Sequence, residues 1–161
     1  MPIYSLWKIL EALNLPEISG QAGHVRAVIH DPCTSRDEKE VQKSVIKIAE
    51  HCNVIVEELE LSGEYTQCCG FGALMFNANP DMAKGVAAHR ITQSPLDYIT
   101  YCSMCRDMLA AEGKSTTCLL DLLFPPPPME AFFPLLLLMT LEKMIVNFYV
   151  FLRMALVRTD L

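Results

Sequence analysis

Residues 25–33 read VRAVIHDPC and join a β-rich segment to a proline and a cysteine. The valines and the isoleucine favour an extended strand over residues 25–30. Pro32 ends this strand, because proline has no backbone N–H to donate within a central sheet. Cys33 therefore lies just beyond the carboxyl end of the predicted strand.

Two further predicted strands lead to the other cysteine motifs. Residues 53–59 (NVIVEEL) form the second strand, and a loop connects it to CCGFG at 68–72, where the glycines allow a tight turn. Residues 97–101 (DYITY) form the third strand and run directly into CSMC at 102–105. Because loops at the carboxyl ends of strands in an open α/β sheet converge on one crevice, we expect these cysteines to meet there.

Apolar residues at helical spacing predict helices before, between and after these strands. The predicted helices cover residues 5–13, 35–52, 79–95 and 103–112. Ser35 and Glu38 are expected to form a capping box at the start of the second helix. Residues 116–120 fit a fourth strand or part of a helix equally well. This order predicts an α/β fold, a small three-layer Rossmann-like domain with a mainly parallel sheet.

Composition divides the chain into three parts. Residues 1–124 form the predicted cysteine-rich domain, with the motif core at 25–124, and residues 125–130 form a proline-rich linker. Residues 131–161 form an apolar tail that is expected to be helical.

The apolar tail leaves several roles open. Glu142 and Lys143 interrupt it, so an unbroken apolar span of about 20 residues is not available. Membrane association through residues 131–157, burial against a partner subunit and a non-native terminus from a disrupted reading frame all fit this composition.

The overall composition restricts the class of partner and the compartment. A formal net charge of -6 makes nucleic acid an unfavourable partner. The chain contains 7 cysteines, and an odd count with an adjacent pair and a C-x-x-C motif favours metal ligands over disulfide bridges. Lys8 and Glu11 break the apolar run that a secretory signal would need. We therefore expect a reducing, cytoplasmic location, with membrane association left open.

The motif cysteines form one spaced set that predicts a metal or cofactor site. Its members are Cys33, Cys68, Cys69, Cys102 and Cys105. The remaining two, Cys52 and Cys118, are interpreted as small buried hydrophobic residues. Soft thiolates select zinc, copper(I) or iron-sulfur clusters. Because structural zinc closes with four ligands, the larger set favours an iron-sulfur cluster, with zinc as the alternative.

A redox dithiol at Cys102 and Cys105 is a competing interpretation, although it leaves the other motif cysteines unexplained. His30 lies close to Cys33 in sequence, where it would suit a proton donor or a group bonded to a metal ligand. We expect it instead to be a histidine hydrogen-bonded at a strand end. No catalytic residue is assigned from the sequence.

The motifs HDPC at 30–33, CCGFG at 68–72 and YCSMC at 101–105 resemble the cysteine-rich CCG domain family. This family includes the catalytic B subunit of heterodisulfide reductase and related oxidoreductase subunits, and the similarity spans residues 25–124. The resemblance implies a non-cubane four-iron four-sulfur cluster. Its ligands would be Cys33, Cys68, Cys69, Cys102 and Cys105.

The resemblance also implies a function and partners. It predicts electron transfer or disulfide reduction within a larger oxidoreductase. The catalytic subunits of the family usually carry two such domains, whereas this chain carries one, so the implied partners are a second CCG domain or flavoprotein and ferredoxin-like subunits. The alternatives are a structural zinc-binding or interaction module without redox activity, and an anchoring fragment that docks through its tail.

Overall fold

The computed structural model describes residues 4–13, 15 and 25–125. The chain divides into two units, 1–125 and 126–161, and the first is described here. The predicted apolar tail at 131–161, with its expected membrane association, and all but the first residue of the predicted linker lie outside the described residues. Within the described ranges, none of the helices has the length and apolar character needed to cross a membrane.

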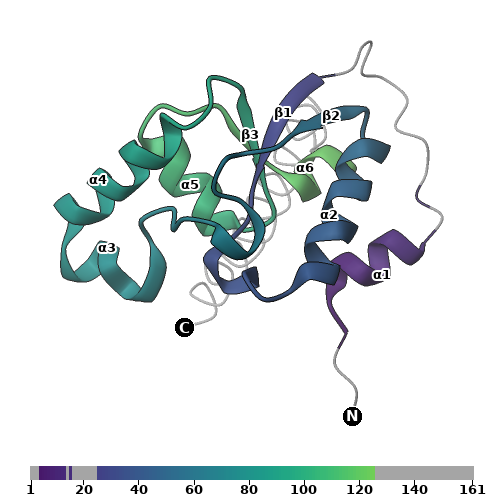
Figure 1. The fold of residues 1–161 in the computed structure, drawn as a ribbon, viewed down its shortest axis with the longest axis horizontal. Coiled ribbons are helices and arrows are strands. Elements are labelled where there is room, and N and C mark those ends of the chain that lie inside the picture. Colours follow the sequence, from purple (N-terminus) through teal and green to yellow (C-terminus); the bar gives the residue numbers. More distant parts are fainter. Residues whose placement is uncertain (1–3, 14, 16–24, 126–161) are drawn as a thin grey trace, which may run out of the picture. The chain divides into compact units, whose positions relative to one another are not determined.

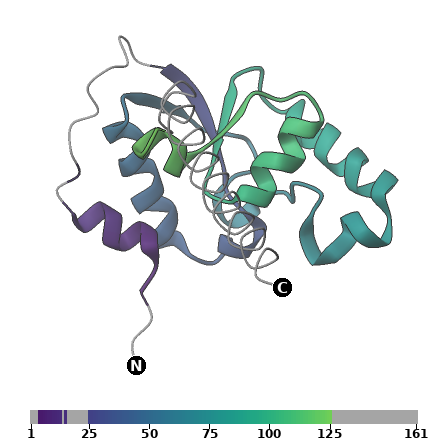
Figure 2. The same ribbon diagram turned by 180° about the vertical axis from the view of Figure 1, so that it is seen from behind.

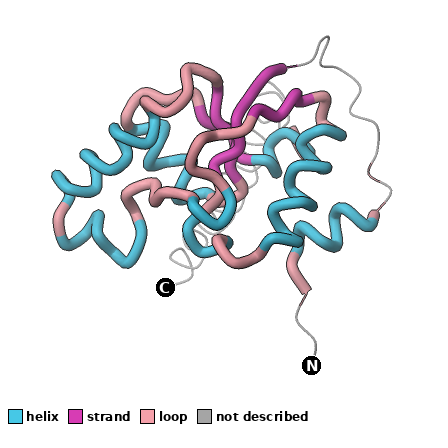
Figure 3. Tube along the Cα trace, viewed as in Figure 1, coloured by secondary structure: helices cyan, strands magenta, loops and turns pink. Residues whose placement is uncertain are grey.

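Four parallel strands form a single sheet in the order β2-β1-β3-β4 (Figures 1 and 3). The strands are β1 (Val25–His30), β2 (Val54–Glu57), β3 (Asp97–Thr100) and β4 (Thr116–Cys118). In the register, Val25 pairs with Val54 and Ala27 pairs with Asp97. The predicted α/β fold with a parallel sheet is therefore confirmed.

The strand order creates a switch point between β1 and β3. The connection that leaves β1 leads to β2 on one side of it, whereas β3 lies on the other side. In open α/β sheets, ligands bind in the crevice outside the carboxyl ends of the strands at such a point. Residues 31–33 and 101–105 follow the two strands that border this crevice.

Helices cover both faces of the sheet, which gives three layers (Figures 1 and 2). The first face packs against α1 (Leu6–Ala12), α2 (Lys39–His51) and α6 (Leu119–Leu123). The second face packs against α4 (Pro80–Ile91) and α5 (Ser103–Ala111), with α3 (Met75–Ala78) beside α4. Short 3₁₀ turns η1 (Cys33–Ser35), η2 (Gly63–Tyr65) and η3 (Gly72–Leu74) lie in the connections.

Alternation along β1 decides which face each side chain joins. Ala27 and Ile29 belong to the core beneath α2, whereas Val28 belongs to the core beneath α4 and α5. Because side chains of a strand alternate between its two faces, His30 is in phase with Val28. The last residue of β1 therefore lies on the α4–α5 side of the sheet.

The predicted capping box at the start of α2 is wrong. The helix begins at Lys39, and Glu38 gives it no side-chain cap. Ser35 lies instead in η1, where its hydroxyl donates to the Pro32 carbonyl at 2.8 Å and lies 2.6 Å from the Tyr101 hydroxyl. Ser35 therefore forms its hydrogen bond within the turn after β1, and the helix starts later than predicted.

The start of α4 is confirmed, because the Asn79 side chain accepts a hydrogen bond from the Met82 N–H at 3.1 Å. On α4, Ala83, Ala87 and Arg90 are buried, whereas Met82 is exposed. Small side chains let α4 pack closely, and an arginine completes the buried stripe.

Residues 116–120 contain both predicted alternatives, since β4 ends at Cys118 and α6 begins one residue later.

Candidate metal centre

The crevice between β1 and β3 receives chemically reactive side chains from three segments. His30 ends β1, and Cys33 begins η1 directly after it. Cys102 is the N-cap residue of α5, and Cys105 lies in the first turn of that helix. The loop at 66–71 brings Cys68 and Cys69 from the connection after β2.

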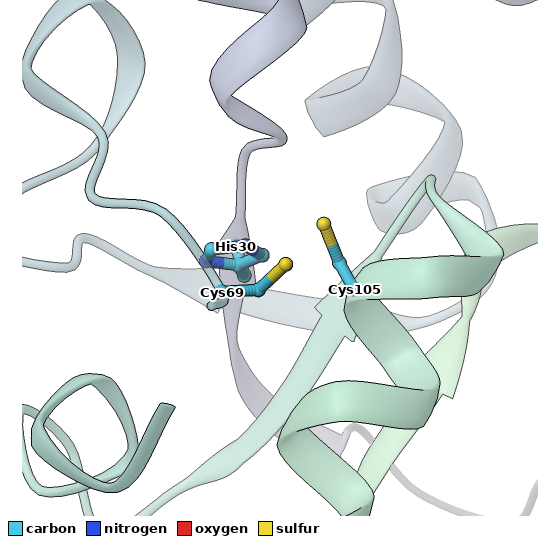
Figure 4. A group of neighbouring side chains, drawn as sticks. All are labelled: His30, Cys69 and Cys105. Carbon is cyan, nitrogen blue, oxygen red and sulfur yellow. The ribbon is translucent and has the colours of Figure 1, made fainter. Parts of the chain in front are cut away.

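Three buried side chains form the inner part of the group. The metal-binding atoms of His30, Cys69 and Cys105 all lie within 4.8 Å of one another. Figure 4 shows the His30 ring beside Cys69, with the two sulfur atoms projecting into the same space. These side chains expose at most 4% of their surface. This group could hold a metal ion.

The other predicted ligands adjoin the inner group. Cys33 contacts Cys68, and the Cys102 thiol contacts Cys105. A Cβ atom on Gly72 would lie 2.8 Å from Cys68 Sγ and 3.7 Å from Cys33 Sγ, which places both sulfurs beside the same turn. The structure therefore brings all of the predicted cysteines to one crevice, with Cys33, Cys68 and Cys102 partly accessible.

The two remaining cysteines lie elsewhere. Cys52 is buried in the core beneath α2, and Cys118 is buried at the end of β4. Both positions agree with the prediction that these residues are small buried hydrophobic side chains. All 7 cysteines of the chain have free thiols.

The thiols of the buried pair Cys69 and Cys105 have pKa values that are shifted in opposite directions. Hydrogen bonding with Cys105 lowers the pKa of Cys69 to about 4, and His30 and the backbone N–H of Phe71 add to this effect against the opposing effect of burial. The same contact raises the pKa of Cys105, as does its own burial. These opposite shifts favour the thiolate on Cys69 and the thiol on Cys105, and thiolates are the form that binds metals.

Gly70 explains how the cysteine pair reaches the crevice. Its φ angle of +100° lies in the region that favours glycine. A Cβ atom there would lie 2.4 Å from the carbonyl oxygen of Ala83 in α4. Its N–H also donates to Cys68 Sγ at 3.3 Å. The glycine of the CCG motif thus lets the loop turn against α4 and place both thiols.

Asp31 connects the loops that surround the group. Its carboxylate accepts hydrogen bonds from the Tyr101 hydroxyl at 2.9 Å and from the Gly63 N–H at 2.8 Å. Its carbonyl oxygen accepts a bond from the Thr66 hydroxyl at 2.7 Å. Since these partners belong to the segments that carry the cysteines, Asp31 holds the three segments together.

His30 is the residue of the group that the predicted ligand set lacked. Its Nδ1 accepts a hydrogen bond from Nε of the fully buried Arg90 at 3.0 Å, which agrees with the expectation of a hydrogen-bonded histidine. Its Nε2 is buried without a nitrogen or oxygen partner and faces Cys69, whose pKa His30 lowers. The alternation of β1 together with the HDPC motif could have placed this ring in the crevice, whereas no sequence pattern identified Arg90.

Two surface cavities each have a cysteine of the group in their lining. A cavity of about 650 Å³ has Trp7, Tyr101 and Cys102 in its lining. A second cavity of about 720 Å³ is bordered by Arg36 and Cys68. Cys102 and Cys68 are thus each reached from a cavity at the surface.

Comparisons with protein-family models, with curated proteins and with solved structures gave no match for this chain. The resemblance of its cysteine motifs to the CCG domain family therefore stays a prediction.

Proposed function

We propose that this chain is an iron-sulfur redox module that works in electron transfer or disulfide reduction as part of a larger oxidoreductase. The proposed ligands are Cys33, Cys68, Cys69, Cys102 and Cys105. The observation that carries the proposal is the convergence of these thiols, from three segments far apart in sequence, on one crevice at the switch point of the sheet.

The extent of the group supports a cluster over a single ion. The inner atoms of His30, Cys69 and Cys105 lie within 4.8 Å of one another, and the Cys33–Cys68 pair extends the group beyond them. A structural zinc ion takes four tetrahedral ligands, which leaves thiols of this set unused. A cluster contains several metal atoms and can use them all.

The N–H groups around the sulfurs also fit an anionic cofactor. Backbone N–H groups of Gly70 and Phe71 face the sulfurs of Cys68 and Cys69. Nε2 of His30, which has no nitrogen or oxygen partner, lies in the same group. Hydrogen bonds to ligand sulfurs tune the reduction potential of iron-sulfur centres, so this environment suits a redox role.

A bound cluster would supply one-electron chemistry. In the proposed disulfide reduction, two electrons from a partner oxidoreductase and two protons cleave one S–S bond and yield two thiols. The cavities beside Cys102 and Cys68 offer approaches for the disulfide and for the partner. The proposed partners are a flavoprotein, a ferredoxin-like subunit or a second CCG-type domain, in a reducing compartment such as the cytoplasm that keeps the thiols free.

The alternative function is a structural zinc site. It is favoured by the compact trio of His30, Cys69 and Cys105, which resembles part of a four-ligand zinc site that another cysteine would complete. Such a module would bind partners without taking up electrons.

Redox titration separates the two functions. Protein loaded anaerobically with iron and sulfide should lose its visible absorption on reduction and recover it on addition of a small disulfide, with release of thiol. Cys69→Ala should abolish this response, whereas Cys52→Ala should retain it, because Cys52 lies in the core outside the crevice. A colourless protein that holds one zinc ion and does not react with reductant would contradict the redox proposal.

A further inference from the structure

Two buried side-chain nitrogens among the described residues stand out, and both belong to one interacting pair. They are Nε2 of His30 and Nη2 of Arg90, and neither has a nitrogen or oxygen partner, although His30 lies close enough to Cys69 to lower the pKa of that thiol. Both side chains are fully buried. An unpaired N–H is costly to bury, so this arrangement calls for an explanation.

Arg90 is held in place on the α4 side of the sheet. Its Nη1 donates to the Leu61 carbonyl at 2.8 Å and to the side-chain oxygen of Gln93. Its own carbonyl accepts a bond from the Tyr98 hydroxyl at 2.9 Å. Its Nε donates to Nδ1 of His30 at 3.0 Å.

The direction of the Arg90–His30 hydrogen bond is fixed by chemistry. A guanidinium has only donors and no acceptor, so Nδ1 of His30 must supply the lone pair. A neutral imidazole carries one proton, and this proton must then be on Nε2. Nε2 is the nitrogen that lies next to Cys69 and Cys105 and has no nitrogen or oxygen partner.

In His30 the roles of the two ring nitrogens, one as hydrogen-bond donor and one as acceptor, are the reverse of those in metal-binding histidines. A ligating histidine uses the lone pair of one nitrogen for the metal and donates the N–H of the other to a carboxylate or a carbonyl. In His30 the outer nitrogen accepts from a cation, so the nitrogen that faces the sulfurs carries hydrogen. It can donate to a thiolate but has no lone pair for a metal.

We propose that Arg90 holds His30 in the tautomer with the proton on Nε2, so that His30 donates a hydrogen bond to the sulfur of Cys69 and is not a metal ligand. The inference rests on the proposed function in taking Cys69 as a cofactor ligand. Arg90 is then a positioning residue. The N–H withdraws electron density from the ligand sulfur, which favours the reduced state of the site.

Nuclear magnetic resonance of the metal-free protein tests the tautomer directly. With ¹⁵N-labelled histidine under reducing conditions, the His30 ring should show a protonated Nε2 and an unprotonated Nδ1. His30→Gln assigns the signal, and His89→Gln is the matched control, because His89 is exposed on the same helix as Arg90. A proton on Nδ1 would overturn the inference.

Pulsed electron paramagnetic resonance of the reduced protein loaded with iron and sulfide tests the ligand assignment. The ¹⁵N coupling of His30 should be weak, as for a nitrogen outside the coordination sphere. A strong coupling of the kind a bound nitrogen gives would show that His30 is a ligand and overturn the proposal. Absence of iron from the wild-type protein would instead refute the proposed function, and the tautomer of the metal-free protein would still decide whether His30 is a donor.

Two substitutions of His30 distinguish the effect of its hydrogen bond to Cys69 from the effect of the space that its side chain fills. His30→Gln keeps an amide N–H for Cys69 and an oxygen for Arg90, so iron content and midpoint potential should stay close to wild type. His30→Leu removes the donor, so iron content should persist while the midpoint potential falls. Loss of iron from both folded variants would contradict the donor role. If His30→Leu does not fold, the His30→Gln variant and the two spectroscopic measurements carry the test.

Discussion

Individual cysteines in this chain differ sharply in environment, and those differences separate reactive from structural thiols. Cys69 lies among hydrogen-bond donors that lower its pKa to about 4. Cys52 is 2% exposed in the core beneath α2, and burial raises its pKa to about 11. The first environment favours the thiolate that binds metals, and the second keeps the thiol neutral and unreactive.

Burial of Cys52 predicts a loss of stability at alkaline pH. Above the ordinary thiol pKa of 9.0 the unfolded chain releases the proton, whereas the folded chain retains it until about pH 11. The free energy of unfolding should therefore fall as pH rises from 9.0 to about 11, with up to about 2–3 kcal/mol of the loss due to Cys52. Urea unfolding of wild type and Cys52→Ala across this range measures the difference, and equal slopes for the two proteins would refute it.

At the scale of elements, the connection between β2 and α4 does most to shape the site. It carries the cysteine pair and contacts both α4 and the turn after β1. Gly70 and Gly72 lie in this connection at points where a side chain would meet another atom. The two glycines are constrained by different neighbours, so their substitution should have different effects.

Gly72→Ala should weaken metal binding while leaving the fold intact. The added Cβ would lie 2.8 Å from Cys68 Sγ, a side-chain atom that can rotate away, so the thiol is displaced from the group. Gly85→Ala is the control, because nothing lies within 4 Å of its Cβ position inside α4, and it should stabilise the fold by about 0.5–1 kcal/mol. Metal content and thermal unfolding of both variants test this, and equal metal content would contradict it.

Gly70→Ala should destabilise the fold itself. Its φ of +100° is unfavourable for alanine, and its Cβ would lie 2.4 Å from the backbone oxygen of Ala83. Strain and overpacking together should cost about 2–4 kcal/mol. Gly113→Ala is the matched control, with a φ of +86° and open space around its Cβ, so it should cost only about 1 kcal/mol. Equal losses in chemical unfolding would argue against the contact with α4.

The sequence predicted the elements better than their faces and ends. Strand composition and the turn residues located three of the four strands and left 116–120 open between a strand and a helix. The position of each cysteine motif after a predicted strand placed the cysteines at one edge of the sheet. The later start of α2 was missed, because the Ser35 hydroxyl bonds to the Pro32 carbonyl and contacts the Tyr101 hydroxyl. The contact with Tyr101 exists only in the folded chain. Arg90 was missed for the same reason, since its partner His30 is distant in sequence.

At the scale of the whole molecule, the order of the strands brings the site together. The switch point between β1 and β3 lies where the HDPC turn and the start of α5 meet, and the loop from β2 brings the cysteine pair to it. Every residue proposed as a ligand lies between positions 33 and 105, within the described part of the chain.

A chain that ends at Pro125 should therefore retain the metal site. The sheet and the helices that cover it are complete by Leu123 within the described residues. Metal content per chain should match that of the full-length protein when both are loaded in the same way. Loss of the metal from a folded, shortened chain would show that residues 126–161 contribute to the site.

Chemical analysis of iron and acid-labile sulfide in anaerobically loaded protein tests the central claim most directly. Wild type and Cys118→Ala should each hold about four iron and four sulfide per chain, while Cys69→Ala should lose both. Cys118 is a suitable control, because it is buried at the end of β4 in the same sheet. A single zinc ion per chain without sulfide, or equal iron in all three proteins, would contradict the account.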